Sequence, residues 1–143
     1  MKLSILTFSK DNLNSIFRLI KNVNDIASEI VIIDSSSKKN YLKLRRKCKK
    51  NERIKLFHYK ALGYVEPFRM LGISKCTYEY IFYLDSDEFA DRKLINYLKK
   101  INIPDYVSAF VAEYGFLGLY LLFSLNFNLE LRGNEPYTSS VDT

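Results

Sequence analysis

Four acidic side chains lie close together in the second half of the chain, at Asp85, Asp87, Glu88 and Asp91. No base stands among residues 85–91, and the next base along the chain is Arg92. Like charges this close destabilise one another unless a cation, a proton or water relieves them. Side chains two positions apart on an extended chain point the same way, so Asp85 and Asp87 would present two carboxylates to one Mg²⁺ or Mn²⁺ ion with room for a diphosphate. The alternative is a solvated turn whose carboxylates favour the start of a helix near Asp91.

The composition narrows the classes of protein that can carry this acidic cluster. A chain of 143 residues that is 48% hydrophobic and 27% charged predicts one compact domain rather than a disordered or repetitive chain. Only two cysteines are present, Cys48 and Cys76, and neither has a close cysteine partner in the sequence, so neither a thiolate zinc motif nor a disulfide framework is indicated. The single histidine, His58, is placed within a strand as a half-buried, hydrogen-bonded imidazole, and it excludes sites built on two imidazoles. Any metal ion must therefore be held mainly by oxygen.

Apolar runs separated by helix-sized segments supply the elements that must position these side chains. A β-branched run such as residues 29–34 is typical of a strand that is covered on both faces, as in a parallel sheet. The pattern predicts strands at 3–8, 29–34, 54–59, 80–84 and 106–112, and helices from Asp11 or Asn12 to 23 and over 41–50, 68–76 and 91–100. This order predicts an α/β domain with a mostly parallel, Rossmann-like sheet.

Polar side chains stand where three of the predicted strands end. They are Thr7, Ser9, Asp34, Asp85 and Asp87. Ligands of open α/β sheets bind beyond the carboxyl ends of the strands. The sequence therefore predicts that these five side chains converge on one edge of the sheet.

The order of these motifs resembles the GT-A glycosyltransferases of family 2. The resemblance covers roughly residues 3–91: a first strand ending in Thr7-Phe8-Ser9, a second closing on Asp34, a helix opening on Arg69-Met70-Leu71-Gly72, and a fourth strand closing on the acidic cluster. Ser9 and Met70 stand where the family has asparagines, and Leu6 where it commonly has proline. The resemblance implies a GT-A fold, with residues 1–91 as the nucleotide-sugar-binding half of a single domain.

The resemblance also implies roles for individual residues. Asp34 would contact the nucleotide base, with Thr7 or Ser9 lining the same pocket. Asp85 and Asp87 would hold Mn²⁺ or Mg²⁺ on the diphosphate of the donor, and Arg69 would offer a guanidinium to phosphate.

The implied reaction is transfer of a sugar from a nucleotide-diphosphate donor to a hydroxyl of a saccharide or lipid-linked acceptor, with inversion. Residues 92–131 would form a shortened acceptor half and residues 132–143 a tail. Glu113, at the end of the predicted fifth strand, is a weak candidate for the catalytic base, and a partly solvated edge residue is the alternative. The competing functions are a relative that binds the nucleotide sugar without turnover, or a basic module that binds a polyanion.

Basic residues are concentrated in one segment. Residues 38–60 carry eleven Lys or Arg against the single acid Glu52. The segment could bind nucleic acid, an acidic glycan or anionic lipid. A lysine-rich amphipathic helix with Tyr41, Leu44 and Cys48 facing the sheet is the simpler interpretation, and it disfavours a nucleic-acid partner.

The most apolar stretch is residues 114–127, which contain no charge and are too short to span a bilayer. Phe116, Leu119, Tyr120 and Phe123 stand at helical spacing and would contribute to the core. Alternatively, the stretch forms an exposed patch that rests on a membrane or is covered by self-association into a homo-oligomer. The absence of an opening secretory signal predicts a cytoplasmic protein, with the inner face of the membrane as the alternative location.

Overall fold

The computed structural model describes residues 2–60, 66–100, 109–113 and 119–124, and side chains only in residues 2–60 and 68–100. The elements are β1 (Leu3–Ser9), α1 (Leu13–Val23), β2 (Glu29–Asp34), α2 (Lys38–Cys48), β3 (Ile54–His58), α3 (Glu66–Lys75), β4 (Tyr80–Tyr83), α4 (Arg92–Lys100), β5 (Ala109–Glu113) and β6 (Leu119–Ser124). The predicted alternation of strands and helices is confirmed up to residue 100. Helix α2 begins three residues earlier than predicted, at Lys38 rather than Tyr41.

The strands form one six-stranded sheet in the order β3-β2-β1-β4-β6-β5. β3, β2, β1 and β4 are parallel, whereas β6 runs antiparallel to both β4 and β5. The predicted, mostly parallel α/β sheet is therefore confirmed. β1 and β2 are almost completely buried because helices cover both faces of the sheet.

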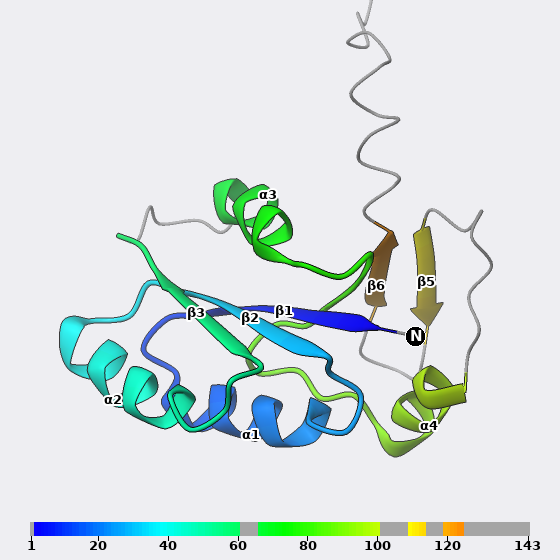
Figure 1. Cartoon of the computed structure of the whole chain (residues 1–143), viewed down its shortest axis with the longest axis horizontal. Coiled ribbons are helices and arrows are strands. Elements are labelled where there is room, and N and C mark those ends of the chain that lie inside the picture. Colours follow the sequence, from blue (N-terminus) through cyan, green and yellow to red (C-terminus); the bar gives the residue numbers. More distant parts are fainter. Residues whose placement is uncertain (1, 61–65, 101–108, 114–118, 125–143) are drawn as a thin grey trace, which may run out of the picture.

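Helices α1, α2 and α4 lie along one face of the sheet, and α3 lies on the other (Figure 1). The larger core forms between the sheet and the helices α1, α2 and α4. Ile16, Leu44 and Leu94 come from these helices, and Ile5 and Ile32 come from the strands. Because side chains alternate along a strand, Leu6, Val31 and Ile33 instead form the smaller core under α3. No helix among the described residues is long and apolar enough to span a bilayer.

The helical interpretation of residues 119–123 is wrong. Leu119, Tyr120 and Phe123 lie in β6, whose backbone pairs with β4 at one edge and β5 at the other. The leucine-rich sequence is a good helix former, but the free edge of β4 offers backbone hydrogen bonds that a local pattern cannot register. Phe116 and the predicted tail at 132–143 lie outside the described residues, as does the start of the predicted strand at 106–108.

Candidate functional site

The carboxyl ends of β1, β2 and β4 meet at one edge of the sheet. β1 lies between the other two, and backbone hydrogen bonds continue past the strand ends, from the Ser35 amide to the Ser9 carbonyl (2.8 Å) and from the Leu84 amide to the Leu6 carbonyl (3.0 Å). The segments that follow β2 and β4 are thus held on either side of β1. This brings Thr7, Ser9, Asp34 and the acidic cluster to one edge, as the sequence predicted.

Asp34 is fully buried at the end of β2, and its carboxylate is hydrogen-bonded on both oxygens. Ser36 donates to it twice, from its hydroxyl to Oδ1 at 2.6 Å and from its amide to Oδ2 at 3.2 Å. Nδ1 of His58 lies 2.7 Å from the same Oδ2, and the imidazole stacks on the Tyr41 ring at a centroid distance of 4.2 Å. The prediction of a hydrogen-bonded His58 is confirmed. These contacts hold the Asp34 carboxylate in one orientation.

Two buried hydroxyls beside Asp34 lack a hydrogen-bond partner in the part of the chain that the structure describes. Thr7 and Ser9 are 0% and 3% exposed, and neither Oγ makes a hydrogen bond within the described part of the chain. Both point to the same face as Leu3 and Ile5 because side chains alternate along β1. Asp34 lies on that face too, directly across from Ser9 in the sheet. Since buried polar groups are normally satisfied, the two hydroxyls mark a place where a ligand can supply the missing partner.

Asp11 connects the loops that follow β1 and β2. Its Oδ1 accepts hydrogen bonds from the Ser37 amide (2.9 Å), the Ser37 hydroxyl (2.8 Å) and Nδ2 of Asn40 (2.8 Å). Its own amide donates to the Ser36 hydroxyl at 2.7 Å, and it takes up a left-handed backbone conformation with φ of 52°. The N-cap of α1 is Asn12 and not Asp11. The Asp11 carboxylate instead accepts from the backbone amide of Ser37, the N-cap of α2. The hydrogen bonds from Ser37 and Asn40 lower the pKa of Asp11.

The acidic cluster is a turn and not the extended segment that the sequence suggested. The Glu88 amide donates to the Asp85 carbonyl at 3.0 Å, which closes a tight turn over residues 85–88. Asp85 and Asp87 are both exposed. The Asp85 carboxylate accepts a hydrogen bond from the Tyr83 hydroxyl, whereas Asp87 makes no hydrogen bond or ion pair with the residues that the structure places. Further along, Oδ1 of Asp91 accepts from the Leu94 amide at 2.7 Å, as predicted for a helix-capping acid.

Electrostatics within the turn favour a cation. Burial raises the pKa of Glu88, and the Asp85 and Asp87 carboxylates raise it further against the lowering effect of its hydrogen bond from the Asp85 amide. Burial, the hydrogen bond to Asp85 and the charge of Asp85 likewise raise the pKa of Tyr83. The Arg69 guanidinium lies over the Tyr83 ring, 5.5 Å from its centroid, and thus stands near the turn as a partner for an anion.

The donor set of the turn fits a hard divalent cation that also binds a diphosphate. Asp85 and Asp87 offer exposed oxygen ligands, which suit Mg²⁺ and Mn²⁺. The residues with described side chains contain no group of three or more side chains that would hold a metal ion by themselves. Water and ligand oxygens would therefore have to complete the coordination, as Mg²⁺ ordinarily requires.

Helix α1 positions the turn through contacts that the sequence did not reveal. Asn22 makes two hydrogen bonds with the backbone of the buried Ala90: its Nδ2 donates to the carbonyl at 2.9 Å, and its Oδ1 accepts from the amide at 3.0 Å. Arg18 lies over the Phe89 ring, 4.5 Å from the centroid, and Nδ2 of Asn12 lies 3.4 Å from the Ser86 hydroxyl. A polar residue within a helix gives no sign in the sequence that its side chain bonds to a distant backbone segment.

Gly72 allows α3 to pack closely on the sheet. A Cβ atom at this position would lie 2.7 Å from Cδ1 of the buried Leu6. The absence of a side chain at Gly72 therefore permits this close approach of helix and sheet. The packing fixes the first turns of α3, from which Arg69 extends.

Glu113 is the last residue of β5. β5 runs in the same direction as β4, with β6 between them, so the backbone of Glu113 ends near the same edge of the sheet as the acidic turn. Its side chain lies outside the described residues.

The fold and the arrangement of this edge define the GT-A class of glycosyltransferase folds. A mannosyltransferase from Pyrobaculum calidifontis, solved with GDP-mannose and Mn²⁺, matches 94% of this chain and 47% of its own at a TM-score of 0.68 and 17% identity. S. aureus TarS (residues 1–349), solved with UDP, matches 62% of this chain and 28% of its own at a TM-score of 0.53 and 19% identity. At these identities, the likeness is one of fold.

The sequence model of glycosyl transferase family 2 matches residues 4–133, and the chain belongs to this family. An uncharacterized glycosyltransferase of Rickettsia bellii is 40% identical over 72 residues, which cover 50% of this chain and 10% of the relative. One from Rickettsia conorii is 45% identical over 60 residues, which cover 42% of this chain and 10% of the relative. The matched segment thus spans about a tenth of the length of these curated relatives.

Proposed function

We propose that this domain transfers a sugar from a nucleotide-diphosphate donor to an acceptor hydroxyl, with inversion and with the help of Mn²⁺ or Mg²⁺. The observation that carries the proposal is the pair of buried hydroxyls at Thr7 and Ser9, which have no hydrogen-bond partner among the described residues and lie beside the fixed carboxylate of Asp34. A site that leaves buried polar groups unsatisfied is prepared for a polar ligand. The solved relatives with GDP-mannose and UDP support a nucleotide as that ligand.

The nucleoside end of the donor would bind beside β1 and β2. Asp34 would accept a hydrogen bond from an N–H group of the base. Ser36 and His58 already fix the orientation of its carboxylate. Preorganisation of this kind reduces the entropy that binding costs. The hydroxyls of Thr7 and Ser9 would complete the polar lining.

The diphosphate end would bind at the acidic turn. Asp85 and Asp87 would hold the metal ion, and the exposed guanidinium of Arg69 would contact a phosphate oxygen. The bound metal ion supplies Lewis-acid stabilisation of the negative charge that collects on the leaving diphosphate. We assign Glu113 the role of the base that removes the proton of the acceptor hydroxyl, since its strand ends near this edge.

The experiment is calorimetric titration of the protein with UDP, GDP, CDP and dTDP, each with and without Mn²⁺. We expect one nucleotide to bind measurably more tightly with Mn²⁺, and Asp87→Asn to abolish that gain. Glu52→Gln is the matched control, because it removes another exposed carboxylate, at the opposite edge of the sheet. If no nucleoside diphosphate shows metal-assisted binding, the donor assignment is wrong.

Turnover is tested separately by following hydrolysis of the preferred nucleotide sugar in the presence of Mn²⁺. Release of sugar that depends on Asp87 supports a transferase. Metal-assisted nucleotide binding without any hydrolysis or transfer would instead favour a nucleotide-sugar-binding relative that has lost catalysis.

A further inference from the structure

Three helices separated in sequence carry exposed bases on one face of the molecule, which we call the cationic face. α1, α2 and α4 cover the same face of the sheet, and every Asp, Glu, Lys or Arg within them is a base: two on α1, six on α2 and four on α4. All of these bases are exposed. Acids border the face at the ends of the helices, and two of them are engaged: Asp25 pairs with Lys99 at 3.4 Å and Asp91 caps α4. By contrast, α3 on the opposite face carries Glu66 with Arg69 and Lys75.

The charge is spread over a broad surface rather than along one line. The three helices lie in a row beneath the sheet in Figure 1. A single-stranded nucleic acid is normally bound along a narrow basic groove with aromatic side chains for stacking. Here the ring of Tyr41, which projects from α2, already stacks on His58. A broad cationic surface better matches an extended anionic surface such as the headgroup layer of a membrane.

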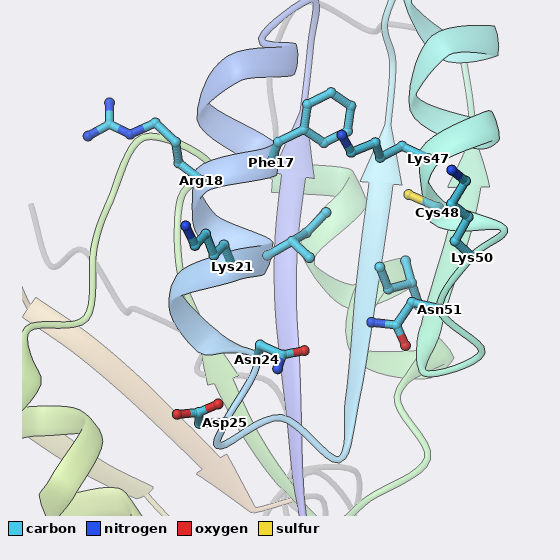
Figure 2. Close-up of a pocket in the computed structure, with 11 residues that line it drawn as sticks. Phe17, Arg18, Lys21, Asn24, Asp25, Lys47, Cys48, Lys50 and Asn51 are labelled. Atoms are coloured by element: carbon cyan, nitrogen blue, oxygen red, sulfur yellow. The ribbon is translucent and has the colours of Figure 1, made fainter.

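Apolar groups are exposed within the cationic face. Leu42 is 39% exposed on α2, about two hundred degrees around the helix from the buried Leu44, and so points away from the sheet. Between α1 and α2 lies an open groove of about 740 Å³, where Phe17, Ile20 and Ile54 supply apolar surface. Lysines border this groove, and Lys47 lies over the Phe17 ring at 5.3 Å (Figure 2). An apolar floor with a cationic rim fits a molecule that has both hydrocarbon and anionic parts.

We propose that the face formed by α1, α2 and α4 docks on a bilayer that contains anionic phospholipids. Lys and Arg side chains attract the headgroups, while Leu42 and the groove between α1 and α2 take up acyl or glycerol groups. Both α1 and α2 start at the carboxyl edge of the sheet and run toward its amino edge. The candidate site therefore lies at the border of the docked face and stays open to donor and acceptor.

The test measures binding of the full chain to vesicles of phosphatidylcholine with 30% phosphatidylglycerol, and to vesicles of pure phosphatidylcholine, by co-sedimentation. We expect binding only to the anionic vesicles, and a marked loss between 0.1 and 0.5 M salt. The double variant Arg46→Gln/Lys93→Gln removes one exposed base from each of two helices. Its partition coefficient should fall about thirty-fold. The control Lys2→Gln/Lys60→Gln removes two exposed bases outside the three helices and should change it less than three-fold.

The apolar contribution is tested with Leu42→Gln. We expect about ten-fold weaker binding at 0.5 M salt, where the electrostatic attraction is screened. Met70→Gln is the control, because Met70 is 60% exposed on α3 at the opposite face and should not affect vesicle binding. Nucleotide affinity measured on all variants should stay unchanged, which separates this proposal from the proposed enzyme activity.

Three results would overturn the proposal: no binding to anionic vesicles at 0.1 M salt, equal loss in the Lys2/Lys60 control, or tighter binding to RNA of mixed sequence than to the vesicles through the same bases. The last result would assign the face to nucleic acid instead.

Discussion

Replacing Asn22 by alanine tests whether α1 positions the acidic turn. The substitution removes both hydrogen bonds to Ala90 and leaves a buried amide and carbonyl without partners. Two bonds of about 1 kcal/mol each, with some added cost for the unpaired buried groups, give a loss of about 2–3 kcal/mol. The higher helix propensity of alanine returns about 0.5 kcal/mol. We therefore expect the free energy of unfolding to fall by about 2 kcal/mol.

The same substitution should also affect metal binding, because Ala90 follows shortly after the acidic turn in the chain. Residues 85–88 lie just before Ala90, so loss of the anchor should widen the range of positions that Asp85 and Asp87 sample. The Mn²⁺-dependent gain in nucleotide affinity should then shrink about ten-fold, while the affinity measured without metal stays the same. Denaturant unfolding and calorimetric titration measure the two quantities.

Two further variants sharpen this test. Asn22→Asp keeps the acceptor for the Ala90 amide but loses the donor to its carbonyl, and it should lie at or below Asn22→Ala in stability. Asn14→Ala is the control, because Asn14 is exposed on the same helix. It should be neutral or slightly stabilising. If Asn22→Ala destabilises the fold but leaves the metal-dependent gain intact, the positioning argument is refuted.

Three other predictions concern the framework of the site. Asp11→Asn should lower the melting temperature at neutral pH, because hydrogen bonds from Ser37 lower the pKa of Asp11 and their benefit needs the carboxylate. The difference from the native chain should begin to shrink as the pH falls below about 4 and should vanish only below the lower pKa that Asp11 has in the folded chain. A difference that does not shrink at all in acid would contradict this. Glu29→Gln removes the charge of a buried carboxylate that pairs with the partly exposed Lys55 at the amino edge, and it should cost about 2 kcal/mol in denaturant unfolding without changing nucleotide affinity. Burial raises the pKa of Cys48 to about 11 and of Cys76 to about 12. Alkylation of these thiols by iodoacetamide at pH 8 should therefore be slow until the chain unfolds. Rapid labelling of the folded protein would contradict this, because it would show that the thiols are accessible.

The central parallel sheet could be predicted because its information is local. Residues 29–34 are apolar and β-branched on nearly every position, and this pattern is typical of a strand that is covered on both faces. The amphipathic spacing of α2, with Leu44 and Cys48 buried and its lysines exposed, was equally readable. Since parallel strands share one carboxyl edge, their order along the chain already placed Thr7, Asp34 and Asp85 together.

The partners of those residues could not be predicted in the same way. Part of the Asp34 environment was local: the serine two positions later donates to its carboxylate, as Asx-turns commonly do. His58, however, reaches Asp34 only through the register of β2 and β3. Asp11 carries the signature of a cap for the helix that follows it, yet it satisfies the start of α2, because the loops after β1 and β2 lie side by side.

The sequence by itself determined which residues carry charge and oxygen ligands, which strands are buried and in what order they end at the site. The tertiary structure alone decided that residues 119–124 form a strand, that Asn22 anchors the acidic turn and that the bases of three helices lie on one face. The physical reason is the range of the interactions. Propensity and periodicity act over a few neighbouring residues, whereas strand pairing, side-chain bonds to distant backbone and the charge of a surface depend on segments that only folding brings together.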